Sequence, residues 1–383
     1  MSIINETIHS KIDMKVKVVE VDFMKKYMTL ILIFSFIIII NFFIIYNKKE
    51  KYIDDNYYAQ KNNPLLAMNL EQTAGAGDYK TVTQSKWPTE GYVFNSELSR
   101  CENGSTLSWD DTNKSVIVSG NISDKCYVYF DIYVVPTFAS YIKSLYTGTQ
   151  GENNLYYHDE TLANGASDNS YRYACADVNA NNYVCFGTNE SPCPENNLYR
   201  VIGVFEGKVK IMKYSSIGDM YWDDTSSYVW KTSSLNTYLN GTFLNSLGNF
   251  SSKISTSIWS ASEISEGIDN NLKSVFDKEM ADSAVKIAAK IGIVYISDLG
   301  YATEPTNRTN KTWKNSGIGC FGNFYGWTIT SSGGGLAWYR GGSDYVNGFV
   351  DLDPYPVRPT FYLNPDVSYI SGTGAKSDPF IIN

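Results

Sequence analysis

Histidine is nearly missing from this chain of 383 residues, which has only His9 and His158. A metal site with several imidazole ligands is therefore excluded, and we expect no metal and no cofactor. A catalytic triad outside the cell would have to use His158, because His9 precedes the membrane segment described below. His158 is followed by Asp159 and Glu160, so we expect it to be a solvated histidine in a polar loop.

Basic charge is also scarce. The chain has 32 Lys and Arg against 40 Asp and Glu, a net charge of -8. Nucleic acids and anionic membrane surfaces require a basic face, so neither is expected as a partner. The ligand is expected to be uncharged or cationic.

Sequence motifs for catalysis are lacking. The glycines Gly333 to Gly335 have no following Lys-Ser/Thr, so they do not form a phosphate loop. Asp351 with Asp353, and Asp223 with Asp224, have the residue types of a glycosidase pair or of calcium ligands. Adjacent and alternate carboxylates are more typical of turns, and a glycosidase pair usually comes from separate strands. Binding is therefore expected rather than catalysis.

One long apolar run is present, residues 28–46, which contain no charged side chain. As a helix it would extend about 28 Å at ~1.5 Å per residue, enough to cross a bilayer core. Apolar residues cover all of its faces, which disfavours a buried core helix. Lysines flank both ends, so they leave its orientation open. A signal peptide that starts at Met24 is the main alternative, although no small-x-small cleavage site follows directly.

The six cysteines all follow this run, and they form no CxxC pair of the kind that binds zinc. Such cysteines indicate disulfides in an oxidising compartment. We therefore expect a single-pass protein of the cell membrane, with residues 1–27 in the cytoplasm and residues 47–383 outside.

The exterior part is predicted to have three sections. Residues 47–86 are polar and are predicted to be a stalk. Residues 87–136 show strand-like alternation with a turn at residues 110–114, and predict a small β domain that a Cys101–Cys126 disulfide closes. Free thiols at these two positions are the alternative. Residues 137–383 predict a larger α+β domain.

This larger domain is expected to contain helices at residues 137–146, capped by Thr137, at 233–247, capped by a serine, and at 274–290. Strands are expected at residues 183–186, 198–205, 208–214 and 293–297, the second and third as a hairpin. Of the three possible pairings of its four cysteines, Cys185 with Cys193 around a tight loop is preferred, which leaves Cys175 for Cys320.

Several segments carry a resemblance. They are Asp168-Asn-Ser-Tyr-Arg-Tyr, Asn182-Tyr-Val-Cys, Asn197-Leu-Tyr-Arg-Val-Ile-Gly, Leu235-Asn-Thr-Tyr-Leu-Asn, Lys290-Ile-Gly-Ile-Val-Tyr-Ile-Ser, Val357-Arg-Pro-Thr-Phe-Tyr-Leu and Ser371-Gly-Thr-Gly-Ala-Lys-Ser-Asp-Pro-Phe. Together they resemble a family of uncharacterised, membrane-anchored surface proteins of AT-rich Gram-positive bacteria. The resemblance implies an extracellular module and, more distantly, a C-type-lectin-like fold related to formylglycine-generating enzymes.

Two departures limit what this resemblance implies. Formylglycine generation needs a late pair of reactive cysteines, and only Cys320 lies there, so that activity is not expected. Glu304-Pro-Thr-Asn307 is similar to the calcium and sugar loop of C-type lectins, but it has an inserted Thr and no Trp-Asn-Asp follows. Calcium-dependent sugar binding is therefore not expected either.

Residues 317–353 are rich in Gly and aromatic residues, which is typical of adaptable binding loops. We predict ligand-binding residues here: Tyr325, Tyr339, Arg340, Asp344 and Tyr345. The alternative is that the rings belong to the core, which is the preferred interpretation for Trp327 and Trp338. Arg340-Gly-Gly-Ser343 is expected to be a tight turn, although it resembles a segment of the formylglycine-generating enzymes.

The expected function is a cell-surface binding or adhesion protein whose lectin-like domain binds a glycan or a protein outside the cell. A cell-envelope hydrolase that uses carboxylates, and a scaffold subunit of an envelope complex, are the alternatives.

Overall fold

The computed structural model describes residues 65–383, except residues 83–85, 89, 122, 177, 310, 316–318 and 342–343, together with four short strands before residue 53. These strands are β1 (Val16–Val19), β2 (Ile33–Phe34), β3 (Ile44–Tyr46) and β4 (Glu50–Tyr52). Most of residues 1–27 and 28–46, the predicted cytoplasmic segment and membrane helix, lie outside the described residues. Among the described residues, no helix is both long enough and apolar enough to cross a bilayer.

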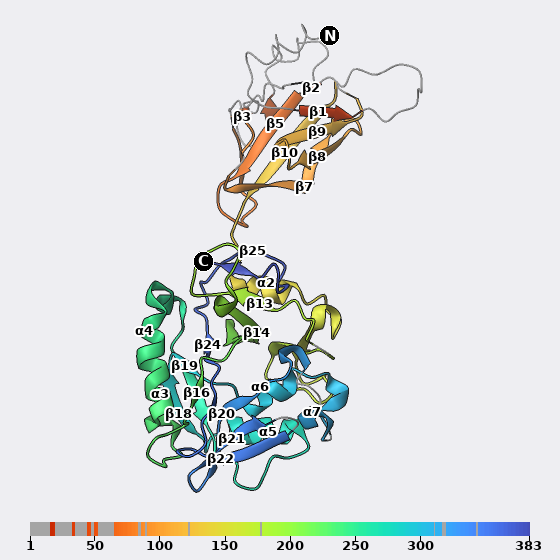
Figure 1. Cartoon of the computed structure of the whole chain (residues 1–383). Helices are drawn as coiled ribbons and strands as arrows, with labels where there is room; N and C mark the ends of the chain where they lie inside the picture. Colours follow the sequence, from red (N-terminus) through yellow and green to blue (C-terminus); the bar gives the residue numbers. More distant parts are fainter. Residues whose placement is uncertain are drawn as a thin grey trace. The chain divides into compact units, whose positions relative to one another are not determined.

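The chain divides into two compact units, Met1–Val134 and Val135–Asn383 (Figure 1), close to the predicted boundary after Pro136. The first unit contains β5 (Leu65–Glu71), β6 (Tyr79–Thr81), β7 (Tyr92–Cys101), β8 (Thr106–Asp110), β9 (Ser115–Ser119) and β10 (Lys125–Ile132). Together with β1 and β2 they form two four-stranded sheets, with strand orders β2-β1-β9-β8 and β6-β5-β10-β7.

The two sheets of the first unit share one apolar core. Side chains alternate along β10, so that Val128 and Phe130 point inward and meet Val116 and Val118 of the other sheet. Strand β5 pairs in parallel with β10. Leu65–Glu71 and the short β6 therefore belong to this unit, although the sequence predicts a stalk there.

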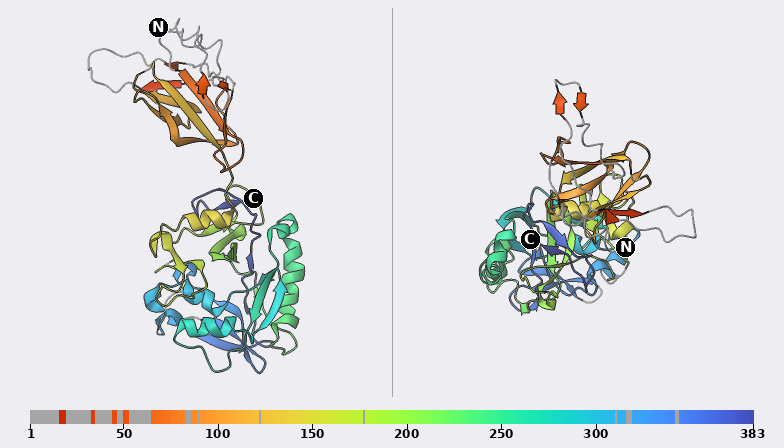
Figure 2. Two further views of the ribbon diagram at one scale, coloured as in Figure 1. Left: turned by 180° about the vertical axis from the view of Figure 1, so that it is seen from behind. Right: turned by 90° about the horizontal axis from the view of Figure 1, so that it is seen from above.

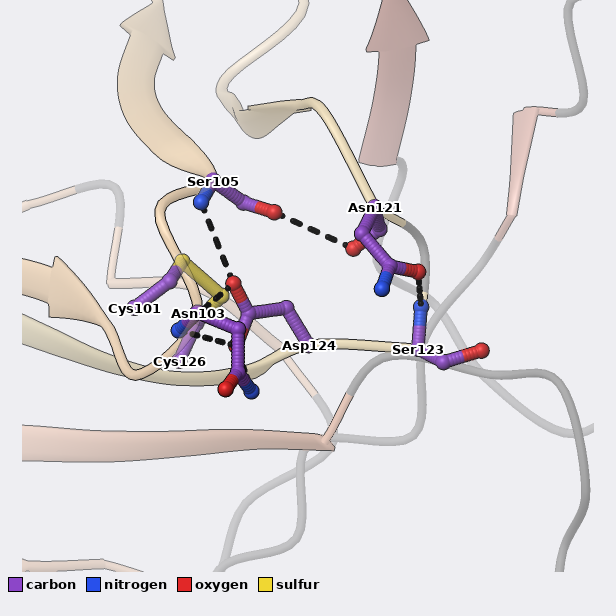
Figure 3. The surroundings of a disulfide bond; sticks show 7 residues. All are labelled: Cys101, Asn103, Ser105, Asn121, Ser123, Asp124 and Cys126. Carbon is purple, nitrogen blue, oxygen red and sulfur yellow. Dashed lines mark hydrogen bonds between the residues drawn. A yellow bond between two sulfur atoms is a disulfide. The ribbon is translucent and has the colours of Figure 1, made fainter.

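The Cys101–Cys126 disulfide joins two residues that face each other across β7 and β10. Asp124 lies beside it, fully buried, and accepts hydrogen bonds from the main-chain N–H groups of Asn103 and Ser105 at 2.9 and 3.1 Å (Figure 3). The predicted disulfide is confirmed. It closes the loop between Cys101 and Cys126, which the buried Asp124 carboxylate orders through these hydrogen bonds.

The second unit holds most of the helices. They are α2 (Phe138–Ser144), α3 (Ser234–Tyr238), a π-helical turn (Leu239–Phe243), α4 (Leu244–Ser246), α5 (Leu272–Met280), α6 (Ile296–Tyr301) and α7 (Thr312–Asn315). Short 3-10 helices lie at Glu152–Asn154, Glu195–Asn197, Trp230–Thr232, Gly248–Lys253, Pro305–Asn307 and Gly319–Phe321. The mixture of helices and strands confirms the predicted α+β class.

Its strands are β11 (Leu155–His158), β12 (Ser170–Tyr173), β13 (Tyr183–Cys185), β14 (Leu198–Phe205), β15 (Lys208–Lys213), β16 (Asp219–Met220), β17 (Ser257–Ala261), β18 (Val285–Ala289), β19 (Ile291–Gly292), β20 (Gly326–Gly333), β21 (Leu336–Gly341), β22 (Asp344–Phe349), β23 (Tyr355–Pro356), β24 (Thr360–Tyr362), β25 (Tyr369–Ser371) and β26 (Ile381–Ile382). A seven-stranded sheet with the path β11-β12-β14-β15-β24-β19, to which β13 adds through β14, forms the centre.

Helical segments lie on both sides of this central sheet. Figures 1 and 2 show the segment with α3 and α4 on one side, and α6 with α7 on the other. The predicted caps are confirmed: Thr137 and Ser233 accept the N–H groups of Ser140 and Asn236, each at 3.1 Å. The predicted hairpin is confirmed as β14 and β15.

The prediction for residues 274–297 is wrong in two places. The helix ends at Met280, and residues Val285–Ala289 instead form strand β18, which pairs with β17 over its full length. Residues 293–295 of the predicted strand have no regular secondary structure, and its last two residues begin helix α6 at Ile296. Pairing with β17 outweighs local helix propensity in the first case, and buried carboxylates that accept N–H groups fix α6 in the second.

The first and last segments of the second unit lie together. Phe138 N–H donates to Val367 O at 2.7 Å, and Tyr369 N–H donates to Pro136 O at 3.0 Å. The rings of Tyr141 and Tyr369 stack with centroids 3.4 Å apart. The Cys185–Cys193 and Cys175–Cys320 disulfides are both present, as predicted.

Candidate functional site

The predicted binding segment folds into a three-stranded antiparallel sheet, β20-β21-β22. Trp327 and Trp338 are buried, as expected for core residues. Their indole N–H groups donate to the main-chain oxygens of Met220 and Ile264 at 2.8 and 2.9 Å. These rings hold the sheet against the rest of the unit.

Arg340 and Tyr345 lie opposite each other on β21 and β22, and both face inward. Arg340 is 2% exposed and donates to the carbonyls of Phe324 and Lys314 at 3.2 and 3.3 Å. Tyr345 is 7% exposed and packs against Trp313. Both side chains therefore stabilise the sheet from inside and do not reach a surface ligand.

The other three predicted residues are accessible to different degrees. Asp344 is exposed, and its carboxylate accepts the N–H of Tyr345 at 2.8 Å. Tyr325 is 43% exposed, and Tyr339 is half-buried. Residues 342–343, the last two of the Arg-Gly-Gly-Ser segment, lie outside the described residues.

Tyr325 and Tyr339 meet a third tyrosine, Tyr355 of β23, which the sequence does not single out. The Tyr339 and Tyr355 rings stack with centroids 3.7 Å apart, and Tyr325 meets them edge-on at 6.2 and 5.8 Å. Gly348 lies behind these rings, where a Cβ would meet Tyr355 and Tyr339 atoms at 3.0 and 3.2 Å. We call Tyr325, Tyr339 and Tyr355 the ring cluster.

The structure corrects the expectation for His158. It ends β11 and is fully buried, not solvated. Its Nδ1 accepts the N–H of Ala166 at 3.0 Å, so the neutral ring carries its proton on Nε2, and the ring packs edge-on against Tyr301. Burial, with the nearby Arg172 and Arg308, holds its pKa well below 6.5. His158 is therefore a neutral core residue.

The carboxylates considered for catalysis or calcium form turn contacts. Asp223 is buried and accepts N–H groups from Thr225, Ser227 and Ser234, at 2.7, 3.0 and 3.1 Å. Asp353 accepts the N–H of Phe349 at 3.0 Å. Within the described part of the chain, no three His, Cys, Asp or Glu side chains are grouped to hold a metal ion.

A cavity of about 570 Å³ opens elsewhere in the second unit, between the central sheet, the β17-β18 ribbon and helices α5 and α6. Apolar and aromatic side chains contribute to its walls: Phe205, Ile258, Phe276, Met280, Tyr295 and Tyr362. Polar and charged side chains line the rest: Asp168, Arg172, Glu206, Lys208, Lys210, Thr256, Ser257, Ser260, Lys286, Ser297 and Asp298.

A buried ion pair lies in this cavity. Lys210 Nζ donates to Asp298 Oδ2 at 2.5 Å, and both side chains are almost fully buried. Lys210 Nζ also lies 4.4 Å from the Tyr295 ring centroid and 5.3 Å from that of Tyr362. Burial lowers the pKa of Lys210, which the Asp298 charge opposes. Asp298 and the aromatic rings together compensate a buried ammonium.

Glu279 of α5 lies next to this pair, fully buried. It accepts the N–H groups of Ile296 and Ser297 at 2.8 and 3.0 Å and the Thr330 hydroxyl at 2.7 Å. Burial raises its pKa to about 7 despite these hydrogen bonds. Glu279 thereby fixes the start of α6, which carries Asp298 into the cavity.

Sequence reasoning missed the cavity because its lining comes from segments between residues 168 and 362. Two local signals were present. Lys210 lies between Val209 and Ile211 in the buried middle of β15. Asp298 lies three residues after Tyr295, whose N–H it accepts at 2.9 Å as in a capping box. Neither signal identifies a ligand site by itself.

Comparison with models of protein families, with curated proteins and with solved structures gave no match for this chain.

Proposed function

We propose that the second unit, Val135–Asn383, is a ligand-binding module of a cell-surface protein, and that the ring cluster contacts a glycan. The observation that carries this proposal is three tyrosine rings in mutual contact, the most exposed of them Tyr325. Tyrosine rings offer large contact area at low entropic cost, together with a hydroxyl for hydrogen bonds. The exposed carboxylate of Asp344 and the acidic net charge favour an uncharged or cationic ligand.

The C-type-lectin-like architecture remains part of this proposal. It rests on the order of the motifs quoted above and on the α+β class. The proposed attachment to the membrane rests on the apolar residues 28–46 and on three disulfides that suit an oxidising exterior.

A glycan array probed with the protein tests the ring cluster. Binding should be lost in Tyr325→Ala and in Tyr355→Ala, which remove contact area from the cluster. Because the Tyr355 ring also packs against buried Trp327, near-UV circular dichroism checks that Tyr355→Ala is folded. Tyr228→Ala is the matched control, because Tyr228 is a similarly exposed tyrosine outside the cluster. Tyr345→Ala is unsuitable, since that ring is buried. Array binding that survives both cluster variants contradicts the proposal.

A different variant, Asp351→Asn, tests the alternative that the protein is a cell-envelope hydrolase. Asp351 Oδ2 accepts the Ser226 hydroxyl at the surface, so Asp351→Asn should fold normally. Turnover of peptidoglycan that disappears in Asp351→Asn would overturn the binding proposal in favour of an enzyme.

Protease treatment of intact cells tests the location. Surface display predicts that the second unit is digested while residues 1–27 remain protected. Strand β1 (Val16–Val19) pairs with β9 of the first unit. Residues 16–19 cannot make this pairing if they lie in the cytoplasm while the first unit lies outside the cell. Digestion of residues 1–27 together with the rest would favour that pairing and contradict the predicted orientation.

A further inference from the structure

A buried polar atom of the cavity lacks a hydrogen-bond partner among the described residues. Ser257 is 8% exposed, and its Oγ is buried with no partner among the described residues. Tyr362 and Asp298 also line the cavity, and Asp298 Oδ2 accepts from Lys210 Nζ and from the N–H of Tyr295. The Tyr295 oxygen accepts the N–H of Ser260 at 2.7 Å, so its hydrogen remains available for another acceptor. Buried polar groups without partners are costly, and a bound ligand can supply those partners.

Aromatic rings form the apolar part of the same cavity. Phe205, Phe276, Tyr295 and Tyr362 line it, together with Met280. A cavity with rings on its walls and a few polar groups between them is the usual form of a small-ligand site, and a volume of about 570 Å³ lies within the usual range. A ligand that fits has apolar faces and polar edges, as a sugar ring does.

The charges of the cavity select against a charged ligand. The two buried basic side chains of the cavity are paired, Lys210 with Asp298 and Arg172 with Asp168. The other charged lining residues, Glu206, Lys208 and Lys286, are exposed or half-buried. An anion would meet the Asp298 carboxylate, and a cation would meet the Lys210 ammonium and the Arg172 guanidinium. A hydroxyl can donate to Asp298 Oδ1 and accept from Tyr295 or Tyr362, with no charge to compensate.

We infer that this cavity binds an uncharged, hydroxyl-rich ring ligand, which is the chemistry of a neutral mono- or disaccharide. The site is distinct from the ring cluster, because no residue of the cluster lines the cavity. The inference can therefore be tested independently of the function proposed above.

Isothermal titration calorimetry on the full chain tests it, with glucose, galactose, N-acetylglucosamine and cellobiose as probes. At least one of them should bind. Ser257→Ala and Tyr362→Phe each remove one hydroxyl of the cavity lining, and each should raise the Kd about fivefold. The double variant should raise it by about tenfold or more. Glucosamine and glucuronate, the charged counterparts, should bind more weakly than the neutral sugars.

Matched variants show whether the effect comes from the cavity. Ser332→Ala and Tyr173→Phe also remove buried hydroxyls without partners among the described residues, but outside the cavity, and they should leave the Kd unchanged. Near-UV circular dichroism confirms that each variant is folded. The inference is overturned if none of the four neutral sugars binds, if the double variant binds as wild type does, or if a charged counterpart binds more tightly. Tyr325→Ala should leave cavity binding intact, which separates this test from that of the ring cluster.

Discussion

Charged side chains inside the second unit are held mainly by main-chain groups and by each other. Arg308 donates to the carbonyls of Thr303 and Tyr301, and Arg340 to those of Phe324 and Lys314. Glu279 accepts two N–H groups of α6. Such groups stabilise one arrangement of the chain, because no other arrangement would satisfy them.

Glu279 makes stability depend on pH. Its pKa is raised to about 7 in the folded protein from an ordinary value of 4.5. The folded state therefore binds a proton more readily than the unfolded state between these values, and the free energy of unfolding falls as the pH rises through 7. Urea unfolding measures this effect. Between pH 5 and pH 8.5, the free energy of unfolding of wild type should fall by about 2–3 kcal/mol relative to that of Glu279→Gln.

The comparison with Glu279→Gln also removes the contribution of His158. Because the folded pKa of His158 lies well below 6.5, its burial lowers stability as the pH falls below 6.5, the opposite slope. This effect is the same in both proteins and cancels in their difference. Parallel stability curves for the two proteins would show that Glu279 titrates normally.

Residue roles were predictable where the local sequence decides them. Thr137 and Ser233 are capping residues because of their position before an apolar periodic segment, and Trp327 with Trp338 alternate as core residues do. The burial of His158 and Tyr345 was not predictable. His158 has polar neighbours in the sequence, which are typical of an exposed loop. Tyr345 faces inward because of the pairing between β22 and β21, which the sequence does not show.

At the scale of elements, residues 271–289 show what sets the two ends of a helix. A capping residue starts α5, and the pairing of the next segment as a strand ends it. Asn271 accepts the N–H groups of Lys273 and Ser274 at 2.9 and 3.3 Å and starts the helix. The following strand, β18, exists because it pairs with β17, whose paired residues lie 24 to 32 positions earlier in the chain. The sequence therefore predicts the helix but not its end, since the end depends on a distant partner.

The Asn271 cap should be measurable through the stability of α5. Asn271→Ala should lower the free energy of unfolding by about 1 kcal/mol, because two N–H groups lose their acceptor. Asn271→Asp should retain most of the stability, since a carboxylate also caps. Thermal unfolding of both variants and of the neighbouring control Asn270→Ala tests this. A loss as large in Asn270→Ala as in Asn271→Ala would show that the cap has no specific role.

At the scale of the whole molecule, the disulfides connect parts that differ greatly in sequence separation. Cys185 and Cys193 are 8 positions apart, while Cys175 and Cys320 are 145 apart. The pairing of Cys175 with Cys320 could be predicted by elimination. Which parts of the fold this disulfide connects could not be predicted from the sequence. Arg200 donates to the carbonyl of Cys320 and fixes that end in the core.

The long disulfide should contribute more stability than the short one. The loop-entropy model gives about 5 kcal/mol for Cys175–Cys320 and about 2.5 kcal/mol for Cys185–Cys193. Urea unfolding of the paired Cys→Ser variants should therefore show about twice the loss for the first pair. Equal losses would show that chain entropy is not the source, and a map of peptides under non-reducing conditions verifies the remaining pairs.

Phe138 meets Val367 and Pro136 meets Tyr369, and Ser368 between them exchanges two main-chain hydrogen bonds with Asn383, so the first and last residues of the unit lie close together. This has a consequence for how the unit can be rearranged. A domain whose entry and exit are hydrogen-bonded neighbours can be joined end to end by a short linker and reopened at an exposed turn such as Glu206-Gly207, with every strand pairing preserved. It can equally be inserted into a surface loop of another protein without separating the two sides of that loop. The second unit is thus suited to circular permutation and to use as an insertable module.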